Sequence, residues 1–89
     1  MESRPAFRPN PRGMDKARAK AVQKAFGGRM KHFRKAIPKL TQEKLGFACG
    51  LDRSYIGRVE RGESNVGLVN IHRIADALKD EPAELFREG

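Results

Sequence analysis

The sequence predicts an all-α fold of five helices. Apolar residues recur every three or four positions in successive stretches, and none of these stretches alternates with the period of two that is typical of a strand. Residues that favour helix caps, and glycines that favour helix ends, separate the stretches. A chain of 89 residues has the size of one small domain, with no room for both a core and a substrate cavity.

The first thirteen residues are expected to form a disordered basic arm. They contain three prolines and almost nothing apolar besides Phe7, so they cannot supply a packed element. We therefore expect one domain, residues 14–89, to follow this arm.

A first helix is expected after Asp15, a plausible N-cap, and it ends before Pro38. Its apolar positions, at intervals of three and four, are Val22, Phe26, Met30, Phe33 and Ile37. Gly27 and Gly28 each weaken a helix by about 1 kcal/mol relative to alanine. We therefore expect the helix to begin in full only near Val22, or to bend there.

Two short helices joined by a tight turn are predicted over residues 42–61. Thr41 and Asp52 are their expected caps, and Lys44 stands where a capping box would need an acidic residue. The expected inward residues are Leu45, Ala48 and Cys49 of the first of these helices, and Ile56 and Val59 of the second. Only Gly50 and Leu51 separate the two helices, with Gly50 in the left-handed position, which is the spacing of a helix-turn-helix.

Two further helices complete the fold. Leu68, Ile71, Ile74, Ala75 and Leu78 share one face of a fourth helix, which follows a polar loop. Pro82 stands at the first position of a last short helix that ends at Phe86. Leu85 and Phe86 either cover a dimer surface or belong to the core.

Basic charge is concentrated in the N-terminal half of the chain. Residues 1–39 carry twelve lysines and arginines against two acidic residues, and residues 40–89 carry seven against nine. A near-neutral domain with a basic arm suits a polyanionic partner, because lysine and arginine displace counterions from phosphates. Lysine-rich helices also serve solubility, so composition alone does not decide.

The outward face of the third helix is rich in hydrogen-bond donors and has no acidic residue after Asp52. The residues expected there are Arg53, Ser54, Tyr55, Gly57, Arg58 and Arg61. Such a face is suited to DNA.

The stretch LTQEKLGFACGLDRSYIGRVERGESN, residues 40–65, resembles the Xre, Cro and phage-repressor family of helix-turn-helix domains. The resemblance extends from about Val22 to Phe86. Gly46 and Cys49 replace alanines that are usual in the family, and the turn KAIPKL is one residue longer than common. The segment LDRSYIGRVERG is also similar to controller proteins of restriction–modification systems. The resemblance implies a five-helix, phage-repressor-like domain that regulates transcription, expected to be a repressor.

The resemblance also implies roles for single residues. Arg53, Ser54 and Arg58 would reach base edges, and each arginine can bond two acceptors of a guanine. Tyr55 would contact either a phosphate or a thymine methyl group. The residues implied to bind phosphates are Thr41, Gln42, Arg61 and Asn65.

A structural set is implied as well, in which Arg34 and Glu60 form an ion pair that fixes the third helix against the first. Gly50 forms the turn of the motif, and Ile56 anchors the third helix in the core.

The arm has two interpretations. The cations of the arm are Arg4, Arg8 and Arg12, and Lys16 is the first cation after it. They either contact phosphates or a minor groove, or they form a solubilising tail. We favour the DNA contact.

A single reading helix covers too few bases to specify a site, so we expect a homodimer on a palindromic operator in double-stranded DNA. No cofactor, metal, small-molecule ligand or membrane partner is expected, because the lone Cys49 and two histidines form no ligand pattern and no apolar run approaches 20 residues. Without a secretory signal, the protein is expected in the bacterial cytoplasm, at the nucleoid.

Three other functions fit the sequence less well. No catalytic constellation is present, so an enzyme is not expected. A DNA-binding antitoxin needs a segment to lie on its toxin, and only the arm is available for that. A nucleoid protein that binds by charge alone would not need the arginine-rich helix.

Overall fold

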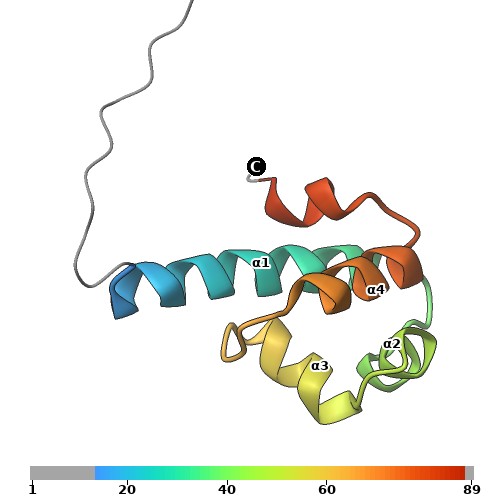
Figure 1. Cartoon of the computed structure of the whole chain (residues 1–89). Coiled ribbons are helices and arrows are strands. Elements are labelled where there is room, and N and C mark those ends of the chain that lie inside the picture. The colour runs from blue at the N-terminus through green and yellow to red at the C-terminus, as the bar shows by residue number, and fades with distance from the viewer. Residues whose placement is uncertain (1–13, 88–89) are drawn as a thin grey trace, which may run out of the picture.

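The computed structural model describes residues 14–87, and in that range it contains four α-helices, one 3-10 helix and no strand (Figure 1). The elements are α1 (Lys16–Ala36), α2 (Gln42–Cys49), α3 (Arg53–Glu60), α4 (Leu68–Leu78) and η1 (Pro82–Phe86). The predicted all-α class is confirmed. The fifth helix is a 3-10 helix rather than an α-helix, with bonds between residues three positions apart such as that from Glu84 N–H to the Glu81 carbonyl, at 3.0 Å. None of the described helices is long and apolar enough to cross a membrane.

Helix α1 is one uninterrupted element, and the expected start near Val22 is wrong. The carboxylate of Asp15 accepts a hydrogen bond from the backbone N–H of Arg18 at 2.8 Å, so the helix begins at Lys16. The glycines inside it do not break it. A side chain on Gly27 would overlap the backbone carbonyl of Val59, so the missing side chain lets α1 and α3 touch. Packing between helices outweighs the local cost of a glycine.

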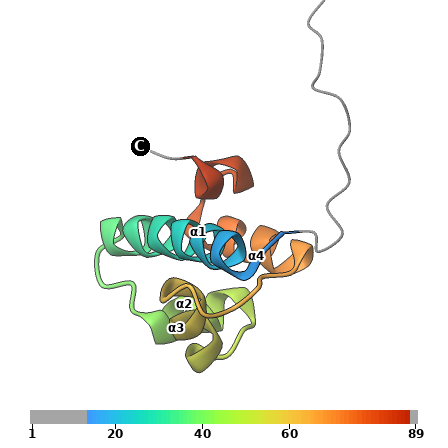
Figure 2. The same cartoon turned by 90° about the vertical axis from the view of Figure 1, so that its left-hand side faces the viewer.

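The helices form one core around α1. Helices α2 and α3 lie on one side of α1 and η1 lies on the other, as both views show (Figures 1 and 2). Each element contributes a fully buried side chain; the largest are Met30, Leu45, Ile56, Val59, Ile74 and Leu85. Burial of Ile56 agrees with its expected anchoring role.

The turn between α2 and α3 has the predicted geometry. Gly50 has a φ of 72°, in the left-handed region where glycine is favoured. The N–H of Leu51 donates to the Gly46 carbonyl at 2.8 Å, and a Cβ on Gly46 would lie 2.6 Å from the Leu51 carbonyl oxygen. Thr41 caps α2 by accepting from the N–H of Lys44 at 3.1 Å. These small residues and caps allow the two short helices to cross closely.

Three apolar residues expected on inward faces are exposed. Val22 lies on α1 ahead of its first buried residue, and Leu68 is the first residue of α4. Neither side chain belongs to the hydrophobic core or packs against it. In α2, Leu45 and Cys49 face the core with a spacing of four, and Ala48 is turned away from it.

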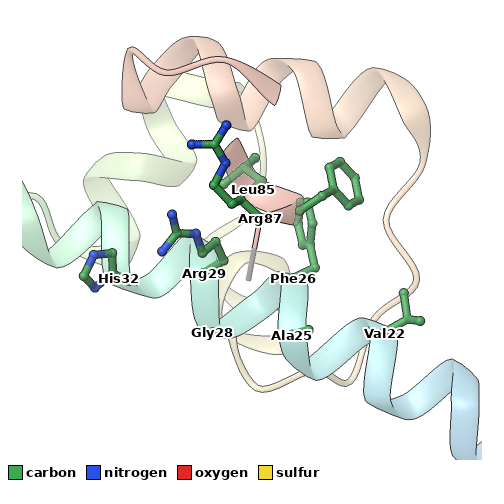
Figure 3. Close-up of a pocket in the computed structure, with 9 residues that line it drawn as sticks. Val22, Ala25, Phe26, Gly28, Arg29, His32, Leu85 and Arg87 are labelled. Carbon is green, nitrogen blue, oxygen red and sulfur yellow. The ribbon is translucent and has the colours of Figure 1, made fainter. Parts of the chain in front are cut away.

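The last segment is anchored to α1. Leu85 is buried in the core, whereas Phe86 is 57% exposed, with its ring centroid 5.3 Å from that of Phe26. Arg29 of α1 donates to the Glu84 carbonyl at 3.1 Å. Figure 3 shows the groove that these contacts border, with Arg29 and Arg87 beside Leu85. Leu85 and Phe86 were expected either to cover a dimer surface or to belong to the core. For Leu85 the core is correct.

The neighbouring glycines of α1 provide a matched test of the packing. Gly27→Ala is expected to lower the free energy of unfolding by about 1 to 3 kcal/mol, because its methyl group overlaps the α3 backbone. Gly28→Ala meets nothing within 4 Å and is expected to raise the free energy by about 0.5 to 1 kcal/mol through helix propensity. Urea unfolding followed by circular dichroism measures both. Equal effects of the two changes would contradict the close contact.

Candidate DNA-binding surface

A buried ion pair joins α1 to α3. Arg34 donates from Nε to Glu60 Oε2 at 2.6 Å and from its second terminal nitrogen to Glu60 Oε1 at 3.1 Å. The two side chains are 11% and 2% exposed, and the remaining terminal nitrogen of Arg34 donates to the Leu40 carbonyl at 3.0 Å. The expected pairing is therefore present, and its two parallel bonds restrict the rotation of α3 relative to α1.

Gln42 extends this pair to the start of α2. Its side-chain amide donates to Glu60 Oε1 at 3.0 Å, a contact that the sequence did not predict. No spacing rule connects positions eighteen residues apart, so only the folded structure reveals it. The side-chain carbonyl and the backbone N–H of Gln42 are not used by this contact. The bond holds the expected phosphate-binding side chain against α3.

The outward face of α3 presents two exposed arginines. Arg53 and Arg58 are both exposed, and Ser54 donates its hydroxyl to the carboxylate of Asp52. Asp52 stands at the N-cap position but makes no capping bond with its side chain, which corrects the expected cap. Ser54 can therefore contact a base edge in two ways. Its hydroxyl either breaks the hydrogen bond to Asp52, or keeps it and accepts a hydrogen bond from the base.

Tyr55 and Gly57 are less outward than expected. The ring of Tyr55 is half-buried against the core, and its hydroxyl accepts from Asn70 at 3.4 Å. The Arg58 guanidinium lies 5.8 Å from the centre of that ring, close enough for a cation–π contact. Gly57 is buried, because the side chains of Gln42 and Arg61 lie over it. The Tyr55 ring therefore lies between the core and the Arg58 guanidinium.

The other expected phosphate contacts lie near the two ends of the motif. Thr41 uses its oxygen as the cap of α2 and remains exposed. Arg61 follows α3 and pairs with Glu63 at 3.1 Å on the surface, and Asn65 is exposed in the next loop. Lys16 is the first residue of α1 rather than part of the arm. Arg4, Arg8 and Arg12 lie outside the described residues.

Cys49 belongs to the core. It is 8% exposed, and burial raises the pKa of its thiol, while the positive charge of Arg73 acts in the opposite direction. The thiol is therefore protonated at neutral pH. Among residues 14–87 no group of three or more potential metal ligands occurs.

Two short helices crossing at a glycine turn, with arginines on the outer face of the second, define a helix-turn-helix DNA-binding domain. The family model "Helix-turn-helix" matches residues 30–85, and the chain belongs to this family. This chain is a DNA-binding transcriptional regulator.

Several similar proteins are named as control or controller proteins. The chain is 41% identical to control protein C.BamHI of Bacillus amyloliquefaciens over 73% of this chain and 80% of that one. It is 38% identical to control protein C.MunI of a Mycoplasma species, over 71% and 85%. The crystal structure of the restriction–modification controller protein C.AhdI from Aeromonas hydrophila superposes with a TM-score of 0.71 at 55% identity, over 74% of this chain and 98% of that one.

Breaking the buried ion pair is expected to destabilise the fold. Glu60→Ala should lower the free energy of unfolding by about 3 to 5 kcal/mol, because Arg34 is left buried without a counter-charge. Glu63→Ala removes an exposed ion pair and is expected to change the free energy of unfolding by less than about 1 kcal/mol. Thermal melts of both variants provide the measurement. A Glu60→Ala melt that overlays the wild-type curve would refute the stabilising role.

Proposed function

We propose that this regulator is the control protein of a restriction–modification system and binds a palindromic operator as a homodimer in the bacterial cytoplasm. The similarity to several control proteins over most of the chain supports the class of system. The observation that carries the DNA-reading role is the position of Arg53 and Arg58. Both are exposed on a helix whose inner face is fixed by the Arg34–Glu60 pair.

In this proposal α3 lies in the major groove. Arg53 and Arg58 each bond the two acceptors of a guanine, and Ser54 and Tyr55 make accessory contacts. Phosphates on either side of the groove are bound by Thr41 and Gln42 at the start of α2, and by Arg61 and Asn65 after α3. The arginines of the arm add contacts that do not depend on sequence.

The dimer surface includes Phe86. A phenylalanine that is more than half exposed beside the partly exposed Val22 forms an apolar patch between α1 and η1. Burial against a second copy would remove this apolar surface from water. The two copies of α3 would then lie about one helical turn of DNA apart, roughly 34 Å.

Selection from a random duplex library at about 150 mM salt tests the proposal, because at that salt concentration binding by charge alone is weak. Wild-type protein is expected to enrich a palindrome with guanines in each half, and Arg53→Ala/Arg58→Ala to enrich none. Phe86→Ser is expected to enrich isolated half-sites or nothing, because the dimer is lost.

Two variants serve as controls. Arg73→Ala removes one exposed arginine from α4, and Phe47→Ser removes a ring that is 90% exposed on α2. Both should still enrich the wild-type palindrome. If wild-type protein enriches no sequence, base reading by α3 is wrong and a protein partner becomes the better explanation. If it enriches an asymmetric site, the homodimer is wrong.

A further inference from the structure

The N-terminal part of α1 extends beyond the core. The buried residues of α1 are Phe26, Gly27, Met30 and Arg34, so residues 16–25 bury none. Figure 1 shows this end of the helix reaching past α3 and α4. Packing does not account for the length of α1, because almost half of the helix contributes no buried residue to the core.

This projecting part carries an excess of positive charge, with Asp15 at the N-cap as the neighbouring carboxylate. Lys16, Lys20 and Lys24 follow one another at intervals of four, which places them on one side of the helix, and we call them the basic spur. Helix α1 contains no acidic residue, and its first turn carries cations at the end where the helix dipole is also positive. Each of these arrangements is unfavourable in the isolated protein. A bound polyanion would make them favourable.

The basic spur lies beside the end of α3. The backbone and side chain of Lys24 pack against Gly62, where an added Cβ would lie 2.6 Å from Lys24 Cγ. Lys16 and Lys20 border a surface hollow together with Gly62 and Glu63. Glu63 is the acidic group at this hollow, and its carboxylate is already paired with Arg61 at 3.1 Å. The spur therefore lies near Arg61, because Glu63 both borders the hollow and pairs with Arg61.

We propose that the basic spur binds the DNA backbone beyond the C-terminal end of α3, independently of base sequence. This rests on the proposed docking of α3 in the major groove and adds phosphates that the helix-turn-helix itself does not reach. The ligand would be the phosphates of duplex DNA, because the spur lies near Arg61, which is itself an expected phosphate-binding residue.

The test is the salt dependence of binding to a duplex of mixed sequence, measured by fluorescence anisotropy between about 50 and 200 mM salt. Lys16→Gln/Lys20→Gln/Lys24→Gln is expected to reduce the slope of log K against log salt by about 0.9 for each phosphate that the variant no longer binds. The affinity at about 150 mM salt should fall at least about tenfold. The variant should remain folded by circular dichroism, because none of the three lysines is buried.

A matched pair of single changes separates local contact from net charge. Lys20→Gln removes a spur residue, and Arg18→Gln removes the same charge two positions away, on the opposite side of the helix. The proposal requires a reduced slope for Lys20→Gln and a wild-type slope for Arg18→Gln. Equal slopes for these two variants, or an unchanged slope for the triple variant, would overturn it. Because the duplex has mixed sequence, the result is independent of whether a specific operator is found.

Discussion

The ion pair between Arg34 and Glu60 is the interaction on which the arrangement of the DNA-binding surface depends. It joins residues 26 positions apart, and it lies where α1, α3 and the start of α2 meet. Charges buried to this extent are costly unless each buried nitrogen and oxygen atom has a hydrogen-bond partner. Glu60 accepts from both Arg34 and Gln42, and Arg34 also bonds the Leu40 carbonyl, so the network meets this condition. A small rotation of α3 would break several of these bonds together.

The ion pair also requires a close approach of the two helices. Gly27 provides it, because no side chain stands between α1 and the last turn of α3. The other cations of α1 contrast with Arg34. They are mostly exposed, and α1 offers them no acidic partner within the helix. Arg34 and Arg29 of this helix therefore serve the fold, and most of its remaining cations are exposed.

Local rules predicted the elements better than their contacts. The caps at Asp15 and Thr41 and the left-handed Gly50 follow from the chemistry of single positions, and the structure contains them. The pairing of Arg34 with Glu60 followed from the family resemblance, because nothing in a linear pattern specifies a partner 26 residues away. The expected effect of the α1 glycines was wrong for the same reason, since propensity is local and the contact that needs Gly27 is tertiary.

The candidate site was predicted in part. Residue type and helical spacing identified the exposed arginines of α3, but they did not show that Ser54 bonds Asp52 or that Tyr55 is half-buried beneath Arg58. Side-chain direction within one short helix depends on neighbours from other helices, such as Asn70 and Gln42.

The central claim is that the Arg34–Glu60 pair holds α3 in the orientation that reads bases. A double-mutant cycle of Arg34→Met and Glu60→Met tests it, with the ratio of affinities for operator and mixed-sequence duplex as the quantity measured. We predict that each folded single variant loses about tenfold or more in this ratio, equivalent to about 1.4 kcal/mol, and that the double variant loses about as much as either single. A folded double variant that keeps the wild-type ratio, or single losses that simply add, would contradict the claim.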